Sequence, residues 1–100
     1  MRVEFAARLW VWDARRPETW TFVSLPDEAS EEIRERVGPS PRGFGSVRVR
    51  VGIGGSRWTT SIFPDSARGC YMLPVKRAVR TAEKLAAGDL ATVTVELLDN

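Results

Sequence analysis

The sequence predicts a mainly β fold: one small barrel of six strands, closed or partly split, with two short helices in the order β-β-α-β-β-β-α-β. Three observations support this prediction. The 100 residues are the size of a single domain. Six short segments either alternate apolar with polar residues or are rich in β-branched and aromatic residues, as strands with one buried face are. Two further segments carry apolar residues at helical spacing.

The first two strands are predicted to form a hairpin. The odd-numbered residues of the segment 3–12 are apolar, whereas Trp10 and Trp12 share the opposite face with charged side chains. A charged stretch with Pro17 then indicates a turn, and residues 20–25 supply the second strand.

The first helix is predicted over residues 28–37. Asp27 is placed to cap its first turn, and acidic residues follow where the helix dipole favours them. Ala29, Ile33 and Val37 lie four residues apart and form the predicted buried face.

The centre of the chain predicts a second hairpin and a third strand. Valines at alternate positions make residues 47–53 the clearest half-buried strand, and Gly54-Gly55 supplies the tight turn that leads into a strand at 57–63. A strand at 70–75 follows and is interrupted by Pro74, which cannot donate a ladder hydrogen bond.

The last two elements are a second helix and a final strand. The helix is predicted over 76–87, where Gly88-Asp89 ends it, and the strand over 90–98. The predicted apolar face of the helix consists of Val79, Ala82, Leu85 and Ala86.

The residues that are absent exclude several chemistries. The chain has no histidine and one cysteine, so Ser-His-Asp and Cys-His catalysis and histidine or thiolate metal sites cannot be built within it. No complete phosphate-binding loop or dinucleotide fingerprint occurs. We therefore predict no metal, no cofactor and no catalytic residue. A binding module is favoured over an enzyme, which would have to depend on Cys70, Tyr71 or a carboxylate.

Cysteine usage and hydropathy bear on location. A single cysteine forms no intramolecular disulfide, which fits a reducing compartment. No signal sequence or run of about 18 apolar residues is present. We expect a cytoplasmic protein, a monomer or homodimer with no membrane partner.

One candidate site is basic and lies around Arg42. Prolines precede this arginine and glycines flank it, which favours a shaped loop whose guanidinium could clamp a carboxylate or phosphate. Lys76 and Arg80, one turn apart on the second helix, extend the basic character. The full candidate set for a small anionic ligand or a protein partner is Arg42, Ser46, Trp58, Ser61, Tyr71, Lys76 and Arg80. The alternative is that Arg42 only ends a strand or pairs with a surface acid.

A second candidate surface could bind nucleic acid. Arg48 and Arg50 share the outer face of one predicted strand, and Arg57 lies across the glycine hairpin. The net charge is only +2, and arginines on an exposed strand also prevent edge-to-edge aggregation.

The four tryptophans could stack on a ligand ring. Because a barrel of this size is filled by its own side chains, we expect two or three of them in the core. Trp10 and Trp12 are the better candidates for exposure.

Several motifs together resemble a known bacterial family, the domain-of-unknown-function family 1905. They are Arg42-Gly-Phe-Gly-Ser-Val47, Trp58, Ser61-Ile-Phe-Pro-Asp65, Gly69-Cys-Tyr-Met-Leu-Pro-Val-Lys76 and Gly88-Asp89. The resemblance implies a double-split β-barrel, a fold class that also includes dimeric DNA-binding regulators. It implies no established activity.

Overall fold

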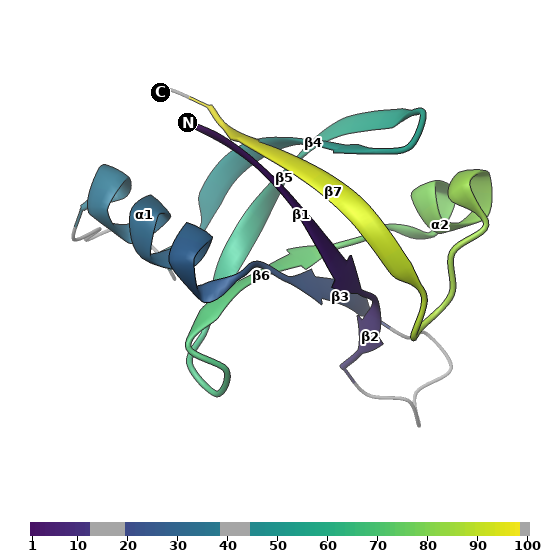
Figure 1. Ribbon diagram of the computed structural model, residues 1–100, viewed down its shortest axis with the longest axis horizontal. Helices are drawn as coiled ribbons and strands as arrows, with labels where there is room; N and C mark the ends of the chain where they lie inside the picture. Colours follow the sequence, from purple (N-terminus) through teal and green to yellow (C-terminus); the bar gives the residue numbers. More distant parts are fainter. Residues whose placement is uncertain (13–19, 39–44, 99–100) are drawn as a thin grey trace.

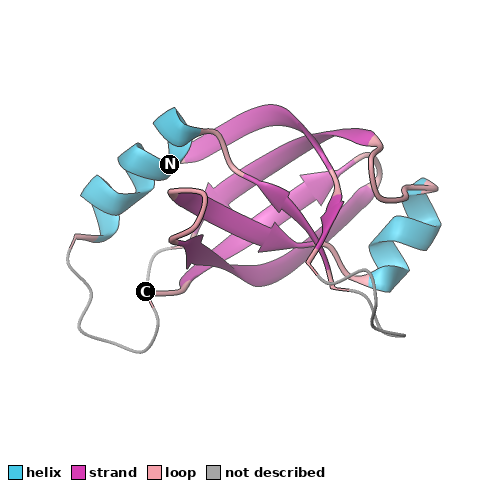
Figure 2. Ribbon diagram, turned by 90° about the horizontal axis from the view of Figure 1, so that it is seen from below, coloured by secondary structure: helices cyan, strands magenta, loops and turns pink. Residues whose placement is uncertain are grey.

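Seven strands form one antiparallel sheet that curls into a half-barrel (Figures 1 and 2). The computed structural model describes residues 1–12, 20–38 and 45–98. Their strands are β1 (Arg2–Arg8), β2 (Trp10–Val11), β3 (Thr21–Ser24), β4 (Val47–Ile53), β5 (Ser56–Asp65), β6 (Cys70–Pro74) and β7 (Leu90–Leu97), and their helices are α1 (Asp27–Val37) and α2 (Arg77–Glu83). The order across the sheet is β1-β7-β4-β5-β6-β3-β2. The two helices lie at opposite ends of the long axis (Figure 1).

The predicted mainly β class is confirmed, but the six-stranded barrel is wrong. The segment predicted as one strand is divided at Leu9 into β1, which pairs with β7, and β2, which pairs with β3. Leu9 donates its N–H to the Asp89 carbonyl over 2.9 Å and accepts from the Gly88 N–H over 2.7 Å. These bonds to a turn replace a strand ladder, so the chain changes partner there and the element order gains a strand.

The long strand β5 belongs to both halves of the sheet. Its first seven residues, 56–62, pair with β4, whereas only residues 63–65 pair with β6. From Met72 toward Pro74, β6 stays paired with β3 on its other edge but no longer pairs with β5, so β5 and β6 separate there. The curl therefore stays open along one side.

The core lies inside the curl and follows the predicted alternation. On β4, Val49 and Val51 are buried while Arg48 and Arg50 are exposed, and β7 buries Ala91, Val93 and Val95. The two-residue turn at Gly54-Gly55 is confirmed: Ile53 pairs with Ser56, and Gly54 has φ +57°.

Helix α1 covers one end of the curl and begins one residue earlier than predicted. Asp27 is its first residue rather than its cap, and the N-cap is Pro26, which makes no side-chain capping bond. Ala29 and Ile33 are buried as predicted, but Val37 is 39% exposed because it lies at the free end of the helix.

A buried serine fixes α1 to the sheet. Ser30 is fully buried, and its hydroxyl accepts the Tyr71 N–H over 3.0 Å. The Tyr71 carbonyl accepts the Leu25 N–H over 2.9 Å, so both backbone groups of Tyr71 have partners in α1 or in the residues that lead into it. Because buried backbone groups require such partners, the buried Ser30 side chain has a structural role.

Helix α2 is shorter than the predicted 76–87. It ends at Glu83, because Lys84 adopts a left-handed conformation with φ +56° and donates its N–H to the Arg80 and Thr81 carbonyls. Val79 is buried and Leu85 half-buried, but Ala82 and Ala86 are exposed. Gly88-Asp89 therefore forms a later turn and not the helix end.

The left-handed residue at the end of α2 gives a stability prediction. We expect Lys84→Gly to raise the free energy of unfolding by about 0.5–1 kcal/mol, because glycine adopts positive φ without the Cβ clash that lysine suffers. Urea denaturation measures the change. Lys84→Ala, which keeps a Cβ, serves as the control and should stay close to the parent protein; equal stabilisation by alanine would contradict the explanation.

No helix within residues 1–12, 20–38 and 45–98 is long and apolar enough to cross a membrane.

Candidate binding groove

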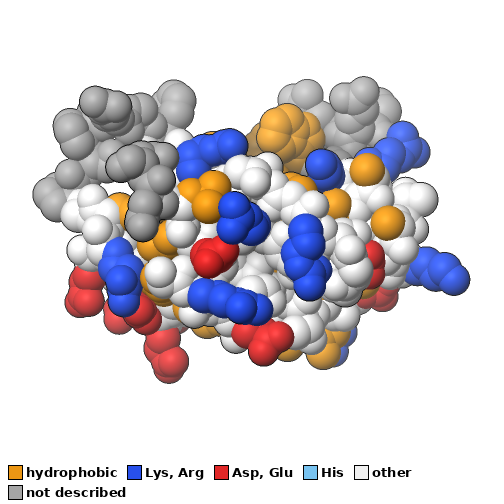
Figure 3. Space-filling model, turned by 90° about the horizontal axis from the view of Figure 1, so that it is seen from above, with side chains coloured by type: hydrophobic (Ala, Val, Ile, Leu, Met, Phe, Trp, Pro, Cys, Tyr) orange, Lys and Arg blue, Asp and Glu red, His pale blue; other side chains and the backbone are white. Residues whose placement is uncertain are grey.

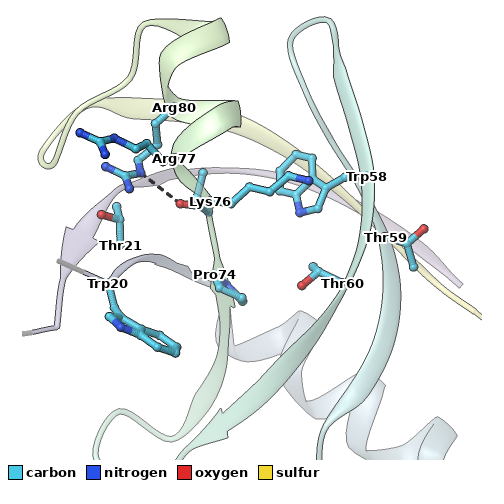
Figure 4. A pocket seen from close by; sticks show the side chains of 10 residues that line it. Trp20, Thr21, Trp58, Thr59, Thr60, Pro74, Lys76, Arg77 and Arg80 are labelled. Carbon is cyan, nitrogen blue, oxygen red and sulfur yellow. Dashed lines mark hydrogen bonds between the residues drawn. The ribbon is translucent and has the colours of Figure 1, made fainter. Parts of the chain in front are cut away.

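A groove of about 590 Å³ opens where β5 and β6 separate (Figure 4). It is lined by Trp20, Thr21, Trp58, Thr59, Thr60, Pro74, Val75, Lys76, Arg77 and Arg80. The volume lies within the range of about 300–1,000 Å³ that is typical of small-ligand sites. The sheet topology thus explains the groove: β5 contributes one wall, and the end of β6 with the start of α2 contributes the other.

Three basic side chains come from the start of α2. Lys76 precedes the helix, Arg77 is its first residue, and Arg80 follows one turn later. The Arg80 Nε donates to the Val75 carbonyl over 3.1 Å, which holds this half-buried side chain against the wall of the groove. No acidic residue is among the described lining residues, so the groove has a positive local charge.

Two tryptophans lie on opposite sides of the groove, with Pro74 between them (Figure 4). Trp58 is on the inward face of β5, opposite Val51, and packs partly against the core. Trp20 immediately precedes β3 and is 63% exposed. The Lys76 side chain extends toward Trp58 (Figure 4). Aromatic faces and positively charged groups therefore meet in one opening.

The prediction for the four tryptophans is wrong in its main part. None is fully buried: Trp12 and Trp20 are each 63% exposed, and Trp10 and Trp58 are half-buried. Trp12 is exposed as expected. Trp10 is partly covered, because its Nε1 donates to the Ser24 hydroxyl over 3.0 Å and the Arg68 guanidinium lies 3.9 Å from its ring centre. Smaller aliphatic side chains fill the curl instead.

The structure brings together three residues of the predicted site: Trp58, Lys76 and Arg80. Arg42 lies outside the described residues. Ser46 is exposed just before the start of β4 and does not line the groove.

The remaining two predicted site residues have structural contacts elsewhere. The Ser61 hydroxyl faces the outside of the sheet and accepts from the Arg48 guanidinium over 3.4 Å. Tyr71 is buried, and the Arg34 guanidinium lies 5.7 Å from its ring centre. Neither is a lining residue.

The predicted site set left out seven of the ten lining residues: Trp20, Thr21, Thr59, Thr60, Pro74, Val75 and Arg77. Arg77 could have been found from its position three residues before Arg80, which places both on neighbouring parts of one helix face. The others depend on where β5 and β6 separate, and nothing in the alternation of either strand marks that point.

The alternative arginine surface lies on β4 and β5, where its side chains alternate with the buried valines of β4. On the face of the molecule that Figure 3 shows, basic side chains gather with acidic ones among them. All three arginines are engaged locally. Arg50 forms an ion pair with Glu96 over 3.2 Å, and Arg48 contacts Ser61. Arg57 donates to the carbonyls of Gly54 and Ser56, each over 2.9 Å, and its side chain lies over Gly52. Glu96 compensates the charge of Arg50, and the other contacts occupy part of the hydrogen-bond donors of Arg48 and Arg57.

One cysteine and two aspartates have structural surroundings. Cys70 is buried, and no group of three or more potential metal ligands occurs in the part of the chain that the structure describes. Asp65 accepts the N–H groups of Ala67 and Arg68 within its turn, and Asp89 accepts that of Ala86. Both aspartates are therefore turn residues, as their sequence context indicates.

Comparison with protein families gives a match over most of the chain. The model of the family described as "Domain of unknown function (DUF1905)" matches residues 5–95, nearly the whole chain. No curated protein matches the sequence.

Proposed function

Since this chain belongs to the DUF1905 family, whose description assigns no activity, we propose from the groove itself that the protein binds a small organic anion carrying a planar ring. The observation that supports this proposal is the gathering of Lys76, Arg77 and Arg80 with two tryptophans around one opening. Guanidinium and ammonium groups recognise carboxylates and phosphates, and indole faces stack on flat rings. The groove has both elements on facing walls.

The proposed ligand lies with its ring between Trp20 and Trp58 and its charge toward the start of α2. The hydroxyls of Thr21 and Thr60 are the polar groups available to orient it. Binding rather than catalysis is proposed, because the described lining contains no carboxylate, thiol or imidazole to transfer a proton at neutral pH.

Tryptophan fluorescence tests this proposal, because the proposed ligand would contact two of the indoles. A panel of ring-containing anions (thymidine monophosphate, adenosine monophosphate and benzoate) is titrated against the protein. Thymidine and inorganic phosphate are titrated separately, because they are the ring part and the anionic part of thymidine monophosphate. We expect at least one intact ring anion to bind more tightly than either half. Lys76→Ala/Arg77→Ala should weaken that binding by about tenfold or more, because hydrogen bonds to charged groups contribute about 1.5–3 kcal/mol each.

Arg36→Ala is the matched control, since Arg36 is exposed on α1 at the far end of the molecule. It removes a positive charge without touching the groove and should leave binding unchanged. Absence of binding by every ring anion at millimolar concentration, or equal weakening by the control, would refute the proposal.

A further inference from the structure

Aromatic side chains continue from the groove onto the outer surface of β2 and β3. Trp20 borders the groove, and its ring centre lies 6.2 Å from that of Phe22 with the planes tilted by 31°. Trp10 lies 5.1 Å from the same phenylalanine ring at 32°. Phe22 itself is buried. The indoles of Trp10 and Trp20 therefore cover it and contribute the accessible surface.

Trp12 extends this surface by one residue. Its N–H donates to the Trp20 carbonyl over 2.9 Å, so the pairing of β2 with β3 continues one step beyond the assigned strands. Both tryptophans are 63% exposed. This backbone pairing places two largely solvated tryptophans at opposite positions of neighbouring strands, where their indoles offer apolar surface to a partner.

Arg68 adds a positively charged plane at the other end of the row. Its guanidinium lies 3.9 Å from the centre of the Trp10 ring and forms an ion pair with Asp65 over 3.0 Å. The side chain is still 49% exposed. The carboxylate and the indole hold the guanidinium in place without covering it. We name Trp10, Trp12 and Arg68 the aromatic extension of the groove.

We propose that the groove and the aromatic extension together bind a single-stranded nucleic acid. This inference rests on the proposed function and assigns the ring anion in the groove as one nucleotide of a longer strand. Every nucleotide supplies a planar ring and a phosphate. Trp20 and Trp12 can stack on successive rings, and the basic residues can bind the phosphates. An acidic peptide would meet the positive charges but would supply rings only at aromatic positions. A duplex keeps its bases stacked on each other and unavailable to the indoles.

Chain length gives the first test. Fluorescein-labelled thymidine oligomers of four and eight nucleotides are compared by fluorescence anisotropy with unlabelled thymidine monophosphate measured by competition. We expect the octamer to bind about 100-fold or more tightly than the monomer, since each stacked base contributes about 1–3 kcal/mol. Contact of the phosphates with Lys76, Arg77 and Arg80 predicts a slope of about −2 in a plot of log K against log salt concentration, because Arg68 is already paired with Asp65.

Variants of the extension separate this inference from the proposed function. Trp12→Ala and Arg68→Ala should weaken octamer binding about 5- to 150-fold and leave monomer binding unchanged, because neither residue lines the groove. Arg68→Lys keeps the charge but loses the planar stack, and should fall between the parent and Arg68→Ala. Thermal melting checks that each variant is folded.

Three outcomes would overturn the inference. If octamer and monomer bind equally, or if folded Trp12→Ala and Arg68→Ala variants bind the octamer like the parent, the extension has no role and only the groove proposal stands. If octaglutamate binds as tightly as the thymidine octamer, the surface recognises negative charge alone and the rings of the strand have no role. An RNA octamer is included as a further arm, and its binding in place of DNA would support the inference and assign the strand type.

Discussion

Leu9→Ala is expected to lower the free energy of unfolding by about 2–5 kcal/mol, the range measured for truncating a buried leucine. Leu9 is 2% exposed and lies in the core cluster at the point where β1 passes into β2. Truncation removes apolar contacts inside the curl and leaves a cavity there. Leu9 is the one residue between β1 and β2, which are the two edge strands of the sheet. A domain of this size has about 5–15 kcal/mol of stability in total, so the loss is severe.

Urea denaturation and thermal melting measure this loss, with a shift of about 4–8 °C for each kcal/mol. Leu90→Ala is the matched control, because this leucine is 58% exposed and the same atoms are deleted. The control should change stability by no more than about 0.5 kcal/mol. Similar losses in both variants would show that Leu9 does not close the core as described.

Gly54→Ala is expected to destabilise the protein by about 2–3 kcal/mol. Gly54 has φ +57°, a conformation in which a Cβ is strained, and a Cβ placed there would lie 2.8 Å from Glu83 Cδ and closer still to Oε1. Glu83 is the last residue of α2, and its carboxylate accepts the Ser56 hydroxyl over 2.7 Å. The alanine therefore strains the turn and also displaces the carboxylate that joins α2 to the hairpin.

A double-mutant cycle separates these two causes. Glu83→Ala alone should cost about 1 kcal/mol through loss of the Ser56 hydrogen bond. In the double variant the clash is absent and only the backbone strain is added, so the two single losses should exceed the double loss by about 1 kcal/mol. Strict additivity would contradict a direct contact between Gly54 and Glu83.

The sequence predicts well where a pattern is local. Alternation in β4 and β7, the Gly54-Gly55 turn and the buried face at Ala29 and Ile33 are all as expected, because burial of one side of a strand or helix imposes that periodicity. The errors arise where tertiary contacts intervene. Leu9 continues the alternation without a break, yet its backbone bonds to a turn 79 and 80 residues away, at Gly88 and Asp89, and this divides the strand.

The candidate site is predicted only in part for a related reason. Lys76 and Arg80 could be paired from helical spacing. Their position beside Trp20 depends on β6 separating from β5 while it stays paired with β3. In β3, three successive residues from Thr21 to Val23 are all buried. Without alternation, the face of the strand that carries Trp20 cannot be assigned from the sequence.

Among the described residues, opposite charges gather at the two ends of the longest dimension, which measures 35 Å. At one end, α1 carries five carboxylates against two guanidinium groups. At the other end, three cations border the groove. An approaching polyanion is repelled from the first end and attracted to the second before any contact forms, so encounters are oriented in advance. Because salt screens exposed charges over about 8 Å at physiological ionic strength, this orientation acts mainly through the association rate and weakens as salt is added.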